Sequence, residues 1–177
     1  MHGKRILELG SGVGVCGITA AMYQDCEVVL TDYLDPVLKI LEENISLNKK
    51  HCPKKMTTRK LDWNNYQVTE KFDIIIGSEL IYSVSPLVKL AKLIKNFLNL
   101  EGGEFWMLMP DERMYGSKFL EIMEGLGFEH RVVTLEDEYY TCSPLEDVEK
   151  GDKQFFPLRE LHFKLYIFTF NNTCSTE

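Results

Sequence analysis

Short apolar segments alternate with amphipathic helical patterns along most of the chain, and this alternation restricts the fold more than any other feature. Seven segments have strand character, and they cover Arg5–Leu9, Glu27–Thr31, Met56–Leu61, Phe72–Gly77, Glu104–Met109, Phe128–Thr134 and Leu161–Phe170. Apolar residues at helical spacing predict helices at Val15–Tyr23, from the N-cap Asp35 through Ile45, from Ser85 through Leu98, and over Phe119–Leu126. Repeated strand–helix units predict a parallel sheet with helices on both faces.

The end of the chain departs from this alternation. A polar segment, residues 135–160, joins the last two predicted strands without a helix, and strands joined in this way pair antiparallel. We therefore predict an α/β fold with a doubly wound, mostly parallel seven-stranded sheet and an antiparallel last strand. The chain has 177 residues, which is enough for one domain with its own core and too few for two, so residues 1–177 are expected to form a single domain.

Composition excludes several classes of function. The net charge of −7 disfavours nucleic acid as a partner, because binding to phosphates requires basic side chains. No apolar run approaches the ~20 residues of a membrane span, so we expect no membrane partner. The five cysteines are scattered, which indicates a reducing compartment, and we therefore expect the protein in the cytoplasm and also in the nucleus. The four histidines are dispersed, so we predict no metal site. We expect a monomer.

Glycine and acidic residues follow the first predicted strand. Glu8 is followed by glycines at positions 10, 12, 14 and 17, which allow a tight turn near a ligand. Counted from Gly12, the glycines match the G-x-G-x-x-G of a dinucleotide site, with Asp32 twenty residues further on. In that motif, however, the first glycine closes the strand, and here that residue is Gly10. A tight turn without any ligand is the plain alternative to both a dinucleotide site and another kind of ligand-binding turn.

Acidic and aromatic residues follow the next two strands. Asp32 and Tyr33 end the second strand, and a carboxylate there can accept both hydroxyls of a ribose. Asp62 and Trp63 end the third, where a carboxylate can accept from an adenine amine and an indole can cover the base. Considered alone, Asp32 is also compatible with a turn or cap and Trp63 with the core. Together, however, a glycine turn, an acid and an acid–aromatic pair follow the first, second and third strands in turn, and this set favours a nucleoside site.

These residues resemble a known family. The motif acid-x-G-x-G-x-G is matched by Glu8, Gly10, Gly12 and Gly14, and with Asp32 and Asp62 the chain is similar to the class I seven-β-strand methyltransferases, which have a Rossmann-like fold, from Arg5 to Phe170. The resemblance implies S-adenosyl-L-methionine as cofactor and S-adenosyl-L-homocysteine as product. It also implies a cofactor-binding set made of Glu8, Gly10, Ser11, Gly12, Gly14, Asp32, Tyr33, Asp62, Trp63 and Ser78.

A narrower resemblance follows the fourth strand. Glu79-Leu80-Ile81-Tyr82 is similar to the D-x-x-Y or E-x-x-Y of the family 16 branch of protein-lysine methyltransferases, in which the segments E-L-G-S-G-V-G-V-C-G-I and L-D-W are also typical. This resemblance implies catalytic roles at the methyl acceptor for two residues: Glu79 binds and orients the ammonium, and Tyr82 forms the channel wall. The aspartate version is commoner, and a solvated Glu79 beside a packed Tyr82 is the plainer alternative.

The hypothesis is therefore a methyltransferase acting on a protein lysine. A protein-histidine or small-molecule methyltransferase and a non-catalytic cofactor-binding module are the alternatives, and a nicotinamide oxidoreductase is disfavoured by the glycine spacing. Members of the branch usually carry a segment before the first strand, so we expect an N-terminal segment to be missing here. Seven acidic residues against one lysine between positions 136 and 152 predict a protein substrate with a basic surface.

Overall fold

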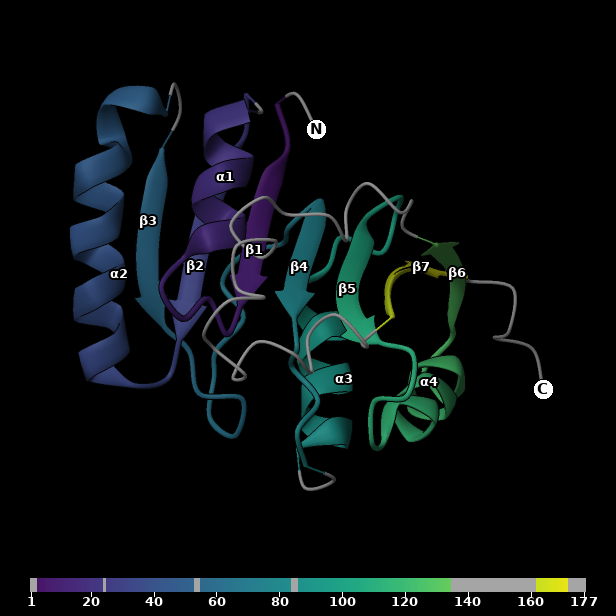
Figure 1. The fold of residues 1–177 in the computed structure, drawn as a ribbon. Helices are drawn as coiled ribbons and strands as arrows, with labels where there is room; N and C mark the ends of the chain where they lie inside the picture. Colours follow the sequence, from purple (N-terminus) through teal and green to yellow (C-terminus); the bar gives the residue numbers. More distant parts are fainter. Residues whose placement is uncertain (1–2, 24, 53–54, 84–85, 135–161, 172–177) are drawn as a thin grey trace.

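Seven strands form one sheet in a computed structural model of residues 1–177, which describes residues 3–23, 25–52, 55–83, 86–134 and 162–171 (Figure 1). The strands are β1 (Arg5–Leu9), β2 (Glu27–Asp32), β3 (Met56–Lys60), β4 (Ile74–Ser78), β5 (Glu104–Pro110), β6 (Phe128–Thr134) and β7 (Phe163–Phe170). Their order in the sheet is β3-β2-β1-β4-β5-β7-β6. Strands β1 to β5 pair in parallel, and β7 pairs antiparallel with both β5 and β6. The predicted doubly wound sheet with a reversed last strand is confirmed.

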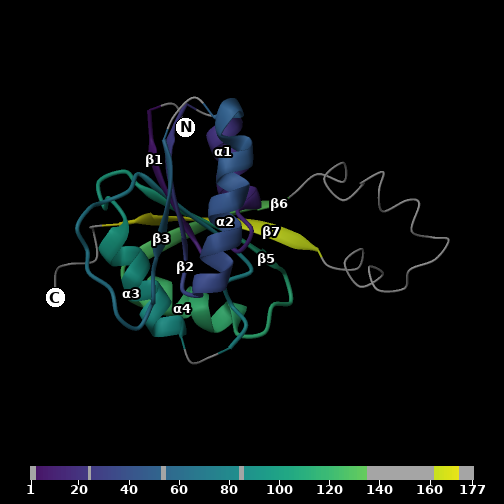
Figure 2. The same cartoon turned by 90° about the vertical axis from the view of Figure 1, so that its left-hand side faces the viewer.

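Helices cover both faces of the sheet. They are α1 (Val15–Tyr23), α2 (Asp35–Asn48), α3 (Leu87–Phe97) and α4 (Gly116–Gly125), with a short 3-10 helix at Lys49–His51. Figure 2 shows α1 and α2 on one side of the sheet and α3 and α4 on the other. Successive strand side chains point to opposite faces, so Ile6 packs with α1 and α2 while Leu7 packs with α3 and α4.

The structure differs locally from the predicted elements. Helix α2 has Leu34 rather than Asp35 at its N-cap position, and no side chain there makes a cap hydrogen bond; the Asp35 carboxylate pairs with the Lys60 ammonium at 2.7 Å. Phe72 lies before β4 and forms an isolated bridge to Leu98. Helix α4 ends at Gly125, and Gly127 (φ 90°) begins the turn into β6. The predicted strand residue Leu161 and the acidic segment 135–160 lie outside the described residues.

The register of the sheet brings the ends of four parallel strands to one edge. Leu9 pairs with Gly77, and Asp32 pairs with Lys60, so the residues that follow β1 and β4, and those that follow β2 and β3, are neighbours. The strand order reverses between β1 and β4. From β1 the chain adds β2 and β3 outward on one side of the sheet, and it then returns to the middle, where β4 and β5 extend the sheet on the other side of β1. Ligands of open α/β sheets bind beyond the carboxyl ends of the strands at such a point.

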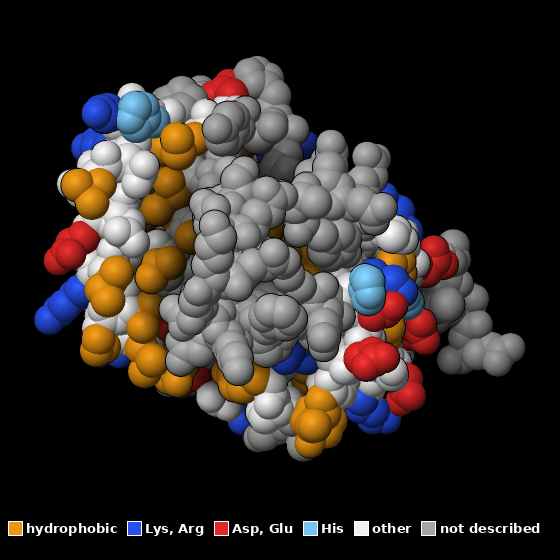
Figure 3. All heavy atoms as spheres, in the orientation of Figure 1, with side chains coloured by type: hydrophobic (Ala, Val, Ile, Leu, Met, Phe, Trp, Pro, Cys, Tyr) orange, Lys and Arg blue, Asp and Glu red, His pale blue; other side chains and the backbone are white. Residues whose placement is uncertain are grey.

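The surface carries some exposed apolar side chains. Figure 3 shows hydrophobic side chains gathered on the α2 side of the molecule, where Leu34, Ile40 and Leu47 are exposed.

Within the described ranges, no helix has the length and apolar character needed to cross a lipid bilayer.

Candidate active site

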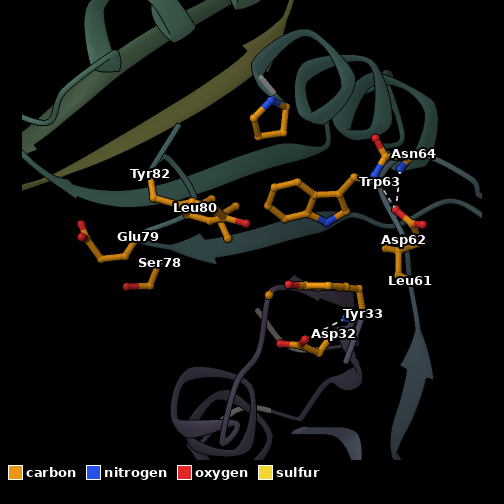
Figure 4. A pocket seen from close by; sticks show the side chains of 12 residues that line it. Asp32, Tyr33, Leu61, Asp62, Trp63, Asn64, Ser78, Glu79, Leu80 and Tyr82 are labelled. Carbon is orange, nitrogen blue, oxygen red and sulfur yellow. Dashed lines mark hydrogen bonds between the residues drawn. The ribbon is translucent and has the colours of Figure 1, made fainter. Parts of the chain in front are cut away.

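A cavity of about 410 Å³ opens at the edge where the parallel strands end. Its volume falls in the range of small-molecule sites, about 300–1,000 Å³. The lining residues come from the segments that follow β1, β2, β3 and β4 and from the start of α3; they are Gly10, Asp32, Tyr33, Leu61, Asp62, Trp63, Asn64, Ser78, Glu79, Leu80, Tyr82 and Pro86. Figure 4 shows Ser78 and Glu79 at one end, Asp62 and Asn64 at the other, and Asp32 with Tyr33 on the wall between them.

The turn after β1 has a backbone that requires glycine. Gly10, Gly12 and Gly14 have φ values of 60°, 53° and 87°, the left-handed region that side chains with a Cβ rarely adopt. Gly14 also lies against α2, since a Cβ there would lie 2.4 Å from Leu41 Cδ1. Of the three glycines, Gly10 lines the cavity.

Asp32 connects the glycine turn to the cavity wall. Its Oδ2 accepts a hydrogen bond from the Gly12 N–H at 3.2 Å, and its Oδ1 accepts from the N–H groups of Tyr33 and Leu34 at 2.8 and 3.2 Å. A carboxylate offers about four acceptor sites, two on each oxygen. Oδ2 therefore retains acceptor capacity toward a ligand in the cavity, while the three backbone donors hold the side chain in place.

Asp62 is oriented by its own loop at the opposite end. The backbone N–H and the side-chain amide of Asn64 both donate to Asp62 Oδ1 at 2.8 Å, and these hydrogen bonds hold the pKa of the Asp62 carboxyl below its usual value. Lys89 of α3 donates to Asn64 Oδ1 at 2.6 Å. Trp63 is partly buried against the α3 side of the core and also lines the cavity. An ionised acceptor therefore lies next to an aromatic face.

The residues after β4 form the other end of the cavity. Glu79 has φ 57°, and its backbone N–H donates to the Leu108 carbonyl of β5 at 3.0 Å. Its carboxylate forms an ion pair with Arg113 from the loop between β5 and α4. Tyr82 is 68% exposed, so its ring is accessible at the cavity mouth.

Two of the predicted cofactor residues are buried beneath the glycine turn rather than on the cavity wall. The Ser11 N–H donates to the Thr31 carbonyl at 2.8 Å, and Ser11 Oγ accepts from the Thr31 N–H at 2.9 Å, so Ser11 joins β1 to β2. Glu8 is 4% exposed, and burial raises the pKa of its carboxyl to about 7 although the Ser11 hydroxyl and the Gly17 N–H oppose the shift. Glu8 Oε2 has no hydrogen-bond partner among the described residues.

The structure thus assembles eight of the twelve predicted site residues around one cavity: Gly10, Asp32, Tyr33, Asp62, Trp63, Ser78, Glu79 and Tyr82. Glu8, Ser11, Gly12 and Gly14 support the turn next to it, and their contact with a cofactor stays a prediction. Sequence reasoning missed Leu61, Asn64, Leu80 and Pro86, which could have been found as neighbours of predicted residues. It also missed Arg113, for which the local sequence carries no signal.

The charges of the cavity favour a cationic ligand. Three of the lining residues, Asp32, Asp62 and Glu79, carry carboxyl groups, and no Lys, Arg or His belongs to the part of the lining that the structure describes. A dinucleotide would place its pyrophosphate among these carboxylates, whereas a ligand with a sulfonium or ammonium group would be attracted by them.

Comparison with known proteins agrees with this geometry. A family model described as lysine methyltransferase matches residues 1–126. A calmodulin-lysine N-methyltransferase from Arabidopsis thaliana is 29% identical over 158 residues, covering 86% of this chain and 52% of the relative. The protein N-lysine methyltransferase METTL21A from Xenopus tropicalis is 28% identical over 144 residues, covering 79% of this chain and 62% of the relative.

The fold has known counterparts among solved structures. Phosphoethanolamine N-methyltransferase 2 from Haemonchus contortus, solved in complex with S-adenosyl-L-methionine, has a TM-score of 0.71 at 16% identity, covering 97% of this chain and 49% of the other. At that identity the likeness shows the fold alone, which is the Rossmann-like methyltransferase fold. The chain spans only about half to three fifths of the length of the two relatives above.

Proposed function

This chain belongs to the lysine methyltransferase family, and from that premise we propose that it is an S-adenosyl-L-methionine-dependent enzyme that methylates the amine of a protein lysine. The observation that carries the proposal is the cavity itself. It brings the residues after β1, β2 and β3 together with Glu79 and Tyr82 in one space that is lined by carboxylates. A nucleoside with a sulfonium group and an incoming amine would both find complementary charge there.

The residues present fit this cofactor. Gly10 has no side chain at the wall, Asp32 Oδ2 retains acceptor capacity for ribose hydroxyls, and Asp62 lies beside Trp63 where an adenine amine and ring would bind. Ser78 and Glu79 lie at the far end, where the methionine portion and the methyl group would point. Tyr33, on the wall between, would cover the ribose.

When bound, S-adenosyl-L-methionine supplies an electrophilic methyl group on a positively charged sulfur. The chain's own task is then to hold an amine in line with that group, because geometry accounts for most of the catalysis of such a displacement. A lysine has a reference pKa of ~10.4 and must lose a proton before its nitrogen can attack. We assign Glu79 to bind and orient the incoming ammonium, and Tyr82 to form the channel wall and to contact the ammonium through a cation–π interaction before the proton is lost.

The partners and location belong to the same proposal. We propose a protein substrate with a basic surface, because the chain carries a net charge of −7 and three carboxyl groups line its cavity. We propose further that the enzyme works as a monomer without nucleic acid, in the cytoplasm and the nucleus. Light scattering after size-exclusion chromatography tests the monomer, and fractionation of cells tests the location.

Transfer of a labelled methyl group tests the reaction. The purified chain is incubated with S-adenosyl-L-methionine labelled in its methyl group and with a protein extract, and the modified residue is located by mass spectrometry. Label on a lysine is the expected result. Label on a histidine would identify the acceptor as imidazole, and binding of S-adenosyl-L-homocysteine without any label would identify a cofactor-binding module without catalysis.

A matched pair of variants locates the acceptor end of the site. Glu79→Ala should lower methyl transfer by about tenfold or more while leaving the affinity for S-adenosyl-L-homocysteine nearly unchanged, because it removes a contact to the amine. Glu121→Ala removes an exposed carboxylate of α4, paired with Lys118, and should change neither quantity. Full turnover in both Glu79→Ala and Tyr82→Phe would contradict the assignment.

A further inference from the structure

The Glu79 side chain is aimed by a constrained backbone. Glu79 has the left-handed φ of 57°, which is uncommon for a residue with a Cβ and persists only where the surrounding structure holds it. The hydrogen bond from its N–H to the Leu108 carbonyl holds it against β5. This conformation directs the carboxylate to the β5 side of the cavity end, where Arg113 binds it.

Arg113 is itself held by a tight turn after β5. Its N–H donates to the Pro110 carbonyl at 3.1 Å, and its carbonyl accepts from the Gly116 N–H at 2.8 Å, where α4 begins. The side chain of Arg113 is 26% exposed and that of Glu79 is 38% exposed. An ion pair whose two side chains are both partly buried is screened by solvent less than a fully exposed pair.

The pairing leaves part of each group unsatisfied. Arg113 contacts Glu79 Oε2, whereas Glu79 Oε1 and Arg113 Nε are buried without a hydrogen-bond partner in the described ranges. A purely structural arginine–carboxylate pair gains most when two parallel N–H···O bonds satisfy both oxygens. A buried carboxylate oxygen left unpaired is costly. Glu79 lines the cavity with a side chain that is 38% exposed, although its Oε1 atom is buried.

We propose that Arg113 is a positioning residue for the methyl acceptor: by binding Glu79 Oε2 it fixes the carboxylate that receives the hydrogen bond of the incoming amine. The proposal rests on the proposed function. The charge of Arg113 matters as well as its geometry, because a lone carboxylate would hold the amine in its protonated, unreactive form. A carboxylate already neutralised by a guanidinium binds the amine without retaining its proton as strongly.

Steady-state kinetics on the substrate identified by label transfer test this role. Arg113→Met should lower kcat by about tenfold, while the KM for the protein substrate stays within about twofold of the wild-type value or falls, since the unpaired Glu79 still attracts the ammonium. Arg113→Lys keeps the charge and should recover a large part of kcat. The control Arg131→Met removes an exposed arginine of β6, which lies outside the cavity, and should leave both constants unchanged.

A double-mutant cycle separates positioning from general structure. If Arg113 acts only through Glu79, Arg113→Met should lower kcat no further, within about twofold, in the Glu79→Gln background. Calorimetry with S-adenosyl-L-homocysteine should give dissociation constants within about twofold for all variants. Additive losses in the cycle, or a kcat of Arg113→Met within twofold of the wild-type value, would overturn the inference while the proposed function stands.

Failure of the proposed function has a different signature. In that case the wild-type protein transfers no methyl group to any protein in the extract. The ion pair is then tested by thermal unfolding of the wild-type protein, Arg113→Met, Glu79→Gln and the double variant. If the two side chains are coupled, the double variant loses less stability than the sum of the losses in the two single variants. Additive changes in melting temperature would overturn the pairing on which the inference rests.

Discussion

Asp32 is the residue at which the glycine turn and the cavity meet. Three backbone N–H groups hold its carboxylate, and Oδ2 retains acceptor capacity toward the cavity. We expect Asp32→Ala to weaken binding of S-adenosyl-L-homocysteine by about 1.5–3 kcal/mol, the contribution of hydrogen bonds to a charged group. Isothermal titration calorimetry measures this loss, and NAD should not bind to the wild-type protein.

The control for this prediction is an aspartate close by in the sequence. Asp35→Ala removes an exposed carboxylate that pairs with Lys60 and does not line the cavity. Its affinity for S-adenosyl-L-homocysteine should match that of the wild-type protein. Equal affinities for Asp32→Ala and Asp35→Ala would show that Asp32 does not hold the ribose.

Glu8 makes stability depend on pH in the direction opposite to that of most carboxylates. Its ordinary pKa is 4.5, and burial raises the pKa in the folded protein to about 7. Between these values the folded protein holds a proton that the unfolded chain has lost. The free energy of unfolding therefore falls as pH rises from about 4.5 to about 7, by on the order of 3 kcal/mol, and the loss persists above pH 7.

Replacing Glu8 by its neutral isostere tests the sign. Urea denaturation at several pH values should show that the wild-type protein loses stability relative to Glu8→Gln between pH 4.5 and pH 8. The same replacement at the exposed Glu27 serves as the control and should leave the pH dependence of the wild-type protein intact. If the wild-type and Glu8→Gln curves run parallel, the buried carboxyl does not titrate in this range.

At the scale of elements, the packing of α2 against the glycine turn is a testable contact. Gly14 has φ 87°, and an added Cβ would lie 2.4 Å from Leu41 Cδ1 of α2. Gly14→Ala therefore combines a left-handed alanine, at about 1–2 kcal/mol, with overpacking of about 1–3 kcal/mol. For a chain of this size each kcal/mol lowers the melting temperature by about 2–4 °C.

Gly102 provides a control with the same backbone and no packing. Its φ is 85°, and an added Cβ would have no atom within 4 Å. Gly102→Ala should therefore show only the conformational cost, and the difference in melting temperature between the two variants measures the contact with α2. Equal losses would mean that α2 moves aside without cost.

For the whole molecule, we expect charge to direct the approach of the protein substrate. The segment 135–160, which lies outside the described residues, carries Glu146, Asp147 and Glu149. Neutralising these three as amides should raise the KM for a basic protein substrate at low salt and leave kcat nearly unchanged. The effect should vanish as salt shortens the screening length from ~10 Å at 0.1 M to ~3 Å at 1 M.

A variant with the same net charge distinguishes local steering from total charge. Neutralising Glu121, Glu124 and Glu129, which do not line the cavity, changes the charge of the molecule by the same amount. Its KM at low salt should stay near the wild-type value. If both triple variants raise KM equally, overall charge rather than the 135–160 segment attracts the substrate.

Most of the fold could be predicted because its signals are local. The three consecutive isoleucines of β4 and the apolar stripe of α3 depend on periodicity within a few residues, and both elements lie where they were predicted. The N-cap of α2 lies at Leu34, one residue before the predicted Asp35, because helix boundaries vary by one or two residues where no side-chain hydrogen bond caps the helix. The pairing of Asp35 with Lys60 of β3, 25 positions away, has no signal in the local sequence.

The candidate site divides in the same way. The glycine turn and the acids after β2 and β3 could be predicted as site residues because they follow the ends of consecutive strands, and Glu79 and Tyr82 because they resemble a family motif. The structure places residues of all these groups around one cavity, and their roles stay predictions. The ion pair of Arg113 with Glu79, the link that Ser11 makes between β1 and β2, and the burial of Glu8 could be seen only in the folded molecule. These contacts depend on how strands distant in the sequence align in one sheet, and side-chain pairing across strands is set by that register.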